Sequence, residues 1–245
     1  MSGQVENINP YQGDEAKHVQ IKRMFDSIAP AYDTMNRLMT LGIDKCWRRR
    51  TVKALSKQAP SSILDIATGT GDLAIAMARR LPETRVTGVD LSRGMVNIGI
   101  DKIKKAGLDG RVTLDVADAL DLPFDDNTFD AVTVAFGVRN FEHLLEGYRE
   151  IRRVLRPGGK TYVLELTTPA CPIVKPFYNF YTRYIIPGIG RMISKDPGAY
   201  TYLPESIRAV PTRGAMTDLM AQAGLKDASY TSMTMGVCTL YVASK

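Results

Sequence analysis

Two acidic residues and the glycine-rich turn between them are the groups of this chain best suited to bind a nucleotide-like ligand. The apolar run Ile63–Ile66 contains Asp65 and leads into Gly69-Thr70-Gly71, after which a helical pattern begins. A second acid, Asp90, ends the next apolar run. Glycines let the backbone approach a ligand closely, and an acid at the end of the following strand accepts hydrogen bonds from ribose hydroxyls. The turn therefore predicts such a ligand, although Asp90 could instead only cap the helix that follows.

The glycine turn fits more than one class of cofactor. Gly69-x-Gly71-x-x-Ala74 matches the dinucleotide fingerprint, which is a weak signal when it stands alone. Three details favour another class: Asp65 lies inside the first strand, Asp118-Ala119 follow the third, and a hairpin signal ends the chain. Asp118 could accept from an adenine amino group, or be a solvated loop acid, and Ala119 leaves room for the ring. Together these details are typical of class I S-adenosylmethionine-dependent methyltransferases.

The elements that must position these residues alternate along the chain. The sequence predicts five strands and three intervening helices, namely Ser62–Ile66, Arg85–Val89, Val112–Ala117, Ala131–Phe136 and Thr161–Leu166, with Asp72–Arg80, Ser92–Ala106 and Glu142–Leu155. This order predicts a parallel, doubly wound sheet. Two short strand-like runs, 229–234 and 237–244, predict an antiparallel hairpin at its end. The expected fold class is therefore α/β, a Rossmann-like methyltransferase fold.

Two further regions flank the predicted sheet. Residues 1–14 are expected to form a loose arm, and residues 15–57 a helical preface interrupted at Pro30. Residues 171–213 gather aromatic side chains and six prolines, so they cannot form one continuous helix. We interpret this block as a lid over a substrate, although its rings could instead pack on the sheet or form a dimer contact. The expected division is a cap of residues 1–57 and a methyltransferase domain of residues 58–245 that includes the lid.

The composition restricts the other possibilities. The chain has 245 residues, 44% hydrophobic and 24% charged, with a formal net charge of +6. This mild basic excess favours an anionic partner or a merely solvated surface, and nucleic acid is not expected. Three cysteines far apart argue against a zinc site and a disulfide framework, so no metal is expected. No signal peptide and no run of ~20 apolar residues is present, which predicts a soluble, cytoplasmic protein.

Several segments resemble one particular group of methyltransferases. They are Met24-Phe25-x-Ser27-Ile28-Ala29-x-x-Tyr32-Asp33-x-Met35-Asn36, Leu64-Asp65-x-Ala67-x-Gly69-Thr70-Gly71-Asp72-Leu73, Leu122-Pro123-Phe124-x-Asp126-Asn127-Thr128-Phe129-Asp130, Phe136-Gly137-Val138-Arg139-Asn140 and Val154-Leu155-Arg156-Pro157-Gly158-Gly159. From about residue 20 to its end the chain resembles the UbiE/MenG family of quinone C-methyltransferases. The Y-D-x-M-N and F-G-x-R-N segments carry this resemblance, since the two glycine turns occur in many methyltransferases.

The resemblance implies both a cofactor site and a substrate. It implies cofactor contacts at Thr70, Asp90, Asp118 and Ala119. Many relatives place a serine at the position of Ala135, so a side-chain hydrogen bond is absent there. The implied reaction is methylation of a ring carbon of a polyprenylated quinol, first of all demethylmenaquinol in menaquinone biosynthesis. The alternative substrate is 2-polyprenyl-6-methoxy-1,4-benzoquinol in ubiquinone biosynthesis.

Methylation of an aromatic carbon requires an activated ring. A phenol titrates near 10, so the site must lower that pKa, accept the proton, or both. Arg139 could stabilise the phenolate and Asn140 could orient the quinol or a water. Tyr32 and Asp33 could complete the polar network, with Asp33 as the proton acceptor.

Each of these assignments has an alternative. Asp33 and Asn36 could only make local hydrogen bonds where the helix breaks, and Arg139 could be a surface partner of Glu142. His143 is a tempting base, but a solvated position in the first turn of its helix is favoured. His18 is expected to be exposed in the mobile arm.

Three further expectations concern partners and competing functions. Lys22-Arg23 and Arg48–Arg50 could meet anionic lipid headgroups in a peripheral membrane contact, and the protein could form a homodimer. An NAD(P)-dependent oxidoreductase is the competing enzyme class, but no Tyr-x-x-x-Lys pair follows the fourth strand. A non-catalytic partner that keeps only the fold is disfavoured, because the acids and the F-G-x-R-N segment are intact.

Overall fold

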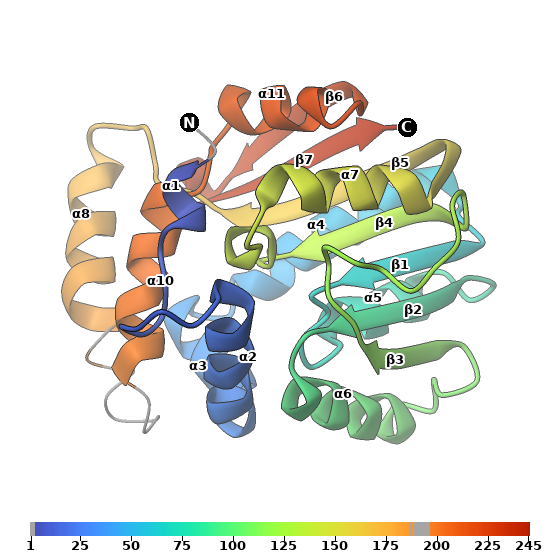
Figure 1. Cartoon of the computed structure of the whole chain (residues 1–245), viewed down its shortest axis with the longest axis horizontal. Coiled ribbons are helices and arrows are strands. Elements are labelled where there is room, and N and C mark those ends of the chain that lie inside the picture. Colours follow the sequence, from blue (N-terminus) through green and yellow to red (C-terminus); the bar gives the residue numbers. More distant parts are fainter. Residues whose placement is uncertain (1–2, 187, 189–196) are drawn as a thin grey trace.

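The computed structural model, which describes residues 3–186, 188 and 197–245, contains a seven-stranded sheet in the order β3-β2-β1-β4-β5-β7-β6 (Figure 1). The strands are β1 Ser62–Ile66, β2 Arg85–Asp90, β3 Val112–Val116, β4 Phe129–Ala135, β5 Leu155–Leu166, β6 Lys226–Met233 and β7 Cys238–Ser244. Strands β1 to β5 pair in parallel, and β7 is antiparallel to both β5 and β6. The predicted parallel sheet with a terminal hairpin is confirmed.

Helices cover both faces of this sheet. Alternate residues of β1 serve the two faces, since Ile63 packs with α4 (Asp44–Leu55) and α5 (Asp72–Arg80), whereas Leu64 packs with α7 (Leu144–Val154) and α11 (Gly214–Gln222). Helix α6 (Arg93–Lys105) begins where predicted, because the Ser92 hydroxyl accepts a hydrogen bond from the Met95 N–H at 3.1 Å. The predicted helix Glu142–Leu155 is shorter in the structure, since its last residue already belongs to β5.

The N-terminal residues are more ordered than the sequence predicts. Helix α1 (Gly3–Glu6) precedes α2 (Lys17–Ile28), the short turn η1 (Ala29–Ala31) and α3 (Tyr32–Met39). Val5 is fully buried, and the Lys17 ammonium donates to its carbonyl at 2.5 Å. The expectation of a loose arm over residues 1–14 is therefore wrong for its described part, because an apolar side chain anchors α1 in the core. The helical preface over residues 15–57 is confirmed.

The aromatic block forms separate helices, as its prolines require. Helix α8 (Val174–Phe180) runs into the π-helical turn η4 (Tyr181–Ile185), and α10 (Pro197–Ala209) follows. Figure 1 places α8 and α10 beside each other at the edge of the molecule, next to α2 and α3. Ile189, Met192 and Ile193, which the sequence assigns to this block, and the side chain of Tyr200 lie outside what the structure describes. Among the described residues, no helix is long and apolar enough to span a bilayer.

Candidate active site

The glycine turn is held from outside by Asp90. Its Oδ2 accepts from the Gly69 N–H at 2.8 Å, and its Oδ1 accepts from the Ser92 N–H at 2.9 Å. Gly69 and Gly71 both have positive φ, +57° and +76°, which glycine adopts without strain. Burial raises the pKa of Asp90 to about 6. The carboxylate thus ties the turn to the start of α6 at the carboxyl end of β2.

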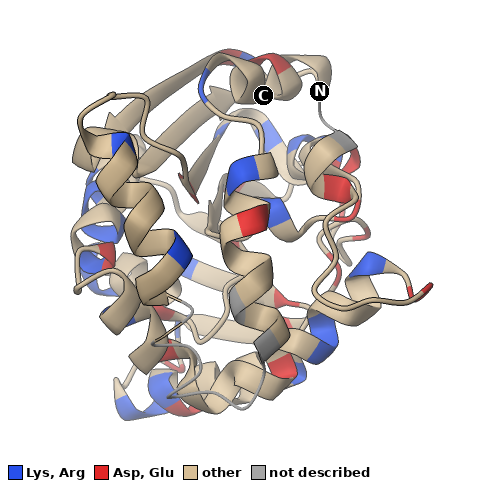
Figure 2. Ribbon diagram, turned by 90° about the vertical axis from the view of Figure 1, so that its left-hand side faces the viewer, with Lys and Arg blue, Asp and Glu red and all other residues tan. Residues whose placement is uncertain are grey.

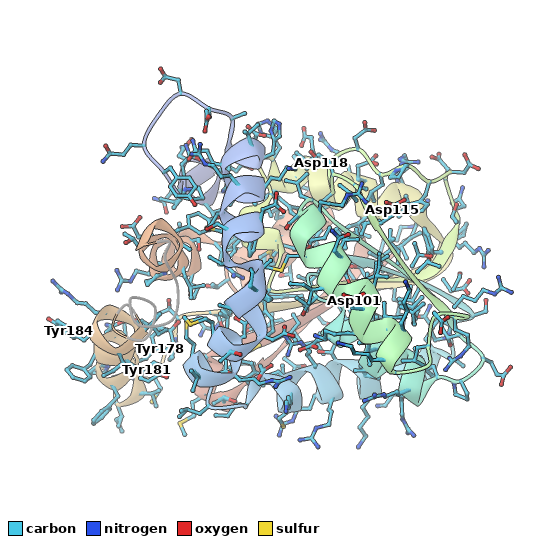
Figure 3. All side chains as sticks on the ribbon, turned by 90° about the horizontal axis from the view of Figure 1, so that it is seen from below. Asp101, Asp115, Asp118, Tyr178, Tyr181 and Tyr184 are labelled. Atoms are coloured by element: carbon cyan, nitrogen blue, oxygen red, sulfur yellow. The ribbon has the colours of Figure 1, made fainter. Side chains whose placement is uncertain are left out.

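A small hollow of about 70 Å³ lies at the carboxyl ends of the strands, and we call it the strand-end hollow. Five of the eight predicted cofactor residues line it, namely Gly69, Asp90, Asp118, Ala119 and Ala135. Asp118, labelled in Figure 3, has one carboxylate oxygen that accepts from the Leu120 N–H at 2.9 Å. Helix α2 covers the hollow with Ile21 and Phe25. The hollow therefore combines two acids with apolar walls.

The other three predicted cofactor residues, Asp65, Thr70 and Gly71, do not line this hollow. Asp65 is buried and accepts from the hydroxyls of Thr68 at 2.7 Å and Thr133 at 2.5 Å. Burial raises its pKa to about 6. The Thr70 hydroxyl donates to Asp33 at 2.6 Å, and Gly71 precedes α5. The side chains of Asp65 and Thr70 therefore support the turn and do not line the hollow.

A second and larger space, the apolar cavity, has a volume of about 410 Å³. It is lined mostly by apolar side chains of α2, α3, α4, α8, η4 and α10. Figure 3 shows three tyrosines of α8 and η4, of which Tyr178 and Tyr181 line the cavity and Tyr184 is 56% exposed. The block therefore lines this cavity, and its role as a lid stays a prediction.

Three aromatic side chains line both spaces: Phe25, Tyr32 and Phe136. The rings of Phe25 and Tyr32 meet edge to face, with centroids 6.1 Å apart. Phe136 has φ +60°, a left-handed conformation that is strained for a bulky residue. The strand-end hollow and the apolar cavity therefore adjoin at these three side chains, which we call the aromatic wall.

Arg139 lies in the wall of the apolar cavity rather than on the surface. Its Nη1 donates to Glu165 Oε1 at 2.8 Å and also to the Phe136 carbonyl, and Glu165 is fully buried. Burial is the largest single effect and opposes the charge of Arg139, but Glu165, Tyr202 and Tyr32 together outweigh burial, so the pKa of Arg139 is raised. Its Nε is buried and has no hydrogen-bond partner among the residues that the structure describes. The alternative of a surface pair with Glu142 is wrong.

Glu142 pairs with a histidine instead. His18 Nδ1 lies 2.6 Å from Glu142 Oε2, which joins α2 to the segment before α7. His18 therefore belongs to the first turn of α2, and its expected place in a mobile arm is wrong. His143 is exposed beside α7, as predicted.

Asn140 and Tyr32 lie close to Arg139, as the family segments imply. Asn140 lines the strand-end hollow, and its Oδ1 accepts from the Tyr202 hydroxyl of α10 at 3.0 Å. Burial raises the pKa of Tyr32, so its phenol stays protonated near neutral pH. Tyr32 is therefore suited to donate a hydrogen bond rather than to accept a proton.

Asp33 departs from its expected role. Its carboxylate accepts from Lys102 Nζ at 2.7 Å and from the Thr70 hydroxyl at 2.6 Å, and it lines neither space. Although burial alone would raise its pKa, the hydrogen bonds from Lys102 and Thr70 lower it. The geometry contradicts Asp33 as the proton acceptor, because the side chain ties α3 to the glycine turn and α6.

Four residues of the site are not predicted from the sequence, or are predicted in another role. The sequence singles out neither Glu165 nor Asp44, places Tyr202 only in the aromatic block, and assigns Arg48 to a basic surface run. Asp44 and Arg48 are nearly buried, pair with each other and line the apolar cavity. Helical spacing was the available signal, because Arg48 shares a face with Thr51, Val52 and Leu55.

Comparison with known proteins identifies the group to which this site belongs. A profile of the ubiE/COQ5 methyltransferase family matches residues 13–245. The chain belongs to the ubiE/COQ5 methyltransferase family. It is 46% identical over 241 residues to a demethylmenaquinone methyltransferase of Porphyromonas gingivalis, covering 98% of each chain. It is also 42% identical over 230 residues to the ubiquinone/menaquinone biosynthesis C-methyltransferase UbiE of a Geobacter species, covering 94% of this chain and 97% of that one.

A comparison with a solved structure shows that this family member shares the methyltransferase fold. The crystal structure of a putative O-methyltransferase from Nostoc punctiforme superposes with a TM-score of 0.63 at 16% identity, covering 90% of this chain and 60% of that chain. At this identity the likeness shows the shared methyltransferase fold. The two acids, the aromatic wall and Arg139 thus lie on a methyltransferase scaffold.

Proposed function

We propose that this protein transfers a methyl group from S-adenosylmethionine to a ring carbon of demethylmenaquinol. The observation that carries the proposal is the pair of adjoining spaces, one with acids at strand ends and the other apolar with a buried arginine. A methyl donor and a lipid-soluble ring can react only if their sites adjoin, so that the reacting atoms approach to about 3–3.5 Å. The two spaces adjoin at Phe25, Tyr32 and Phe136, which line both of them.

The strand-end hollow suits an adenosyl group. Asp90 offers a carboxylate to ribose hydroxyls, and Asp118 offers one to the adenine amino group. Leu91, Met95 and Phe141 line the same hollow and can cover the faces of a purine. S-adenosylmethionine, when bound, supplies a methyl group on a positively charged sulfur. Because that charge disappears during transfer, apolar walls do not oppose the reaction.

The apolar cavity suits a quinol with an isoprenoid chain. Its lining is aliphatic and aromatic, so an isoprenoid chain that enters it gains roughly 25 cal/mol of binding free energy per Å² of apolar area removed from water. Arg139 donates to the oxygen that becomes a phenolate, and Tyr32 and Asn140 hold the ring and its oxygens in position. The phenolic O–H proton passes to water, the ring carbon gains the methyl group, and the hydrogen of that carbon then moves as a proton to the ring oxygen. The quinol is thereby restored with the net release of one proton.

The naphthoquinol is favoured because the relative from Porphyromonas gingivalis is a demethylmenaquinone methyltransferase, and the benzoquinol of ubiquinone biosynthesis is the second candidate because of the family's UbiE members. A nicotinamide-dependent oxidoreductase has no comparable support. The antiparallel end of the sheet differs from the all-parallel sheet expected for that class.

A methyl-transfer assay with both quinols tests the proposal. The purified protein is incubated with labelled S-adenosylmethionine and with each reduced quinol, and product mass and methyl position are determined. We expect a C-methylated naphthoquinol. In parallel, S-adenosylmethionine and NADH are compared for thermal stabilisation. Stabilisation by NADH alone, or no methylated quinol from either substrate, would contradict the proposal.

We also propose that residues 1–57 act as a cap on the methyltransferase domain, and that the mouth of the apolar cavity touches a membrane. Exposed apolar side chains occur on the segments that line this cavity or directly adjoin its lining residues, namely Leu41 78%, Ile173 76%, Phe177 75%, Phe180 59% and Tyr184 56%. Residues 173–186 contain Lys175 and Arg183 and no acid. Figure 2 looks onto this side, where the ribbon carries few charges. This surface replaces the expected run Arg48–Arg50, because Arg48 is buried.

Flotation with anionic vesicles tests the membrane contact. Leu41→Asp with Phe177→Asp should abolish recovery with the lipid, because two charges would enter the interface. Tyr230→Asp is the control, since Tyr230 is exposed on β6 and does not line the cavity. Equal recovery of all three proteins would refute the contact. The expected homodimer stays a prediction, which sedimentation analysis can test.

A further inference from the structure

Two buried arginine–carboxylate pairs border the apolar cavity, which Arg139, Arg48 and Asp44 line, and the proposed function uses only the pair of Arg139. Beside Arg139–Glu165 stands Arg48–Asp44, both supplied by α4. Arg48 is 9% exposed and Asp44 3%. Arg48 Nη1 donates to Asp44 Oδ2, and Thr40 donates to the other carboxylate oxygen at 2.9 Å. The second pair is therefore nearly as buried as the first, whose residues are 6% and 0% exposed.

The two pairs approach the same aromatic residue from different elements. The guanidinium carbon of Arg48 lies 5.5 Å from the centroid of the Phe136 ring, and Arg139 donates to the Phe136 carbonyl. Both positive charges also act on Tyr32, where they oppose the effect of burial and favour a lower pKa. The aromatic wall where transfer must occur is therefore flanked by two guanidinium groups.

Such pairs are not an efficient way to stabilise a fold. Burying two charges requires strong compensation, and apolar side chains of similar volume often stabilise a protein as well or better. Arg48 also has two unpaired donor atoms, because its Nε and Nη2 have no hydrogen-bond acceptor among the described residues. Donors that face an otherwise apolar space are suited to a ligand oxygen.

We propose that the Arg48–Asp44 pair binds the second oxygen of the quinol, so that the cavity selects a ring with two para oxygens over a monophenol. This inference rests on the proposed function. One oxygen, next to the accepting carbon, meets Arg139, and the opposite oxygen then meets Arg48 as donor and Asp44 as acceptor. An aromatic diol satisfies both pairs, whereas a monophenol leaves one pair without its ligand.

The test compares two ligands that differ in one hydroxyl. A 3-prenyl-1,4-dihydroxynaphthalene carries both oxygens, and 3-prenyl-1-naphthol keeps only the oxygen next to the accepting carbon. Binding is measured by calorimetry and by the fluorescence of Trp47, the only tryptophan of the chain, which lines the cavity. The wild type should prefer the diol by about tenfold or more, because a hydrogen bond to a charged group is lost with the monophenol.

Arg48→Gln should reduce this preference to less than about twofold, mainly by weakening the diol. Arg50→Gln, an exposed change on the same helix, should keep the full preference. If Arg48→Gln does not fold, Arg48→Lys preserves the charge, and its preference should fall to an intermediate value. An equal loss for both ligands, or an unchanged preference, would overturn the inference. Because wild-type methyl transfer is assayed separately, its absence would refute the proposed function instead.

Discussion

Arg139 and Glu165 form an ion pair across 2.8 Å although they come from different elements, the turn η3 (Val138–Asn140) and the last residues of β5. Strands β4 and β5 are neighbours in the sheet, with Ala135 opposite Leu164, so the residues that follow them meet at the carboxyl edge. The Leu166 N–H donates to the same Glu165 oxygen at 2.8 Å. Glu165 is thus fixed by backbone and fixes the guanidinium of Arg139 at the cavity wall.

We expect Arg139→Lys to separate methyl transfer from cofactor binding. Lysine keeps the charge opposite Glu165, but it replaces the planar fork of donors with a compact ammonium. Turnover should fall by roughly 10²-fold, the usual order for a lost oxyanion donor, while the affinity for S-adenosylmethionine stays within about twofold. Single-turnover kinetics and calorimetry measure the two effects. Arg149→Lys, at an exposed pair with Glu146, is the matched control, and equal turnover of both variants would exclude a role for the guanidinium.

Cofactor affinity should depend on pH through Asp90. Folding raises the pKa of this acid from 3.8 to about 6, so between these values the folded state holds a proton that the unfolded state has lost. Its contribution to stability therefore declines as the pH rises from about 4 to about 6. Cofactor binding has the opposite trend, because the ribose needs the carboxylate: affinity should be constant above about pH 7 and fall below about 6. Equilibrium dialysis from pH 5 to 8 measures this.

Two variants assign that pH dependence to a residue. Asp90→Asn should bind S-adenosylmethionine weakly at every pH, with no step near 6. Asp65→Asn removes the other buried acid whose pKa is about 6, and it should keep the step. A step that persists in Asp90→Asn and vanishes in Asp65→Asn would transfer the effect to the acid beneath the turn.

Asp33→Asn should affect stability rather than chemistry. The Asp33 carboxylate pairs with Lys102 at 2.7 Å, and its lowered pKa means that it stabilises the fold above its unfolded value of 3.8 and loses this effect in acid. The pair is about one quarter exposed, so solvent screens it and the variant should lose only about 1 kcal/mol at neutral pH. Turnover should change by less than about threefold, measured beside chemical denaturation. A loss of 10²-fold at unchanged stability would restore Asp33 as a proton acceptor.

The sequence predicts what is local and leaves open what depends on chain crossings. The glycine turn and the Ser92 cap follow from patterns of a few residues and are confirmed in geometry, whereas cofactor binding by Asp90 stays a prediction. The position of Asp33 could not be read in this way, because Lys102 reaches it from a helix 69 residues away. Arg48 was misassigned because two exposed arginines follow it, although helical spacing distinguishes their faces. Glu165 carried a signal, since an acid in an apolar strand needs a buried partner.

The last prediction concerns the N-terminal helix α1, which lies in a segment that the sequence predicts to be a loose arm. Glu6 Oε1 accepts from the Leu144 N–H at 2.8 Å, so a residue outside α7 caps the first turn of that helix and places a negative charge at the positive end of its dipole. Glu6→Ala should therefore lower the free energy of unfolding by about 1 kcal/mol, and Glu6→Gln, which keeps an acceptor, by less. Urea denaturation at constant m-value measures both. Glu15→Ala, at an exposed pair with Arg23, is the control and should change stability little. If Glu6→Ala matched this control, α1 would lie against the core without stabilising α7.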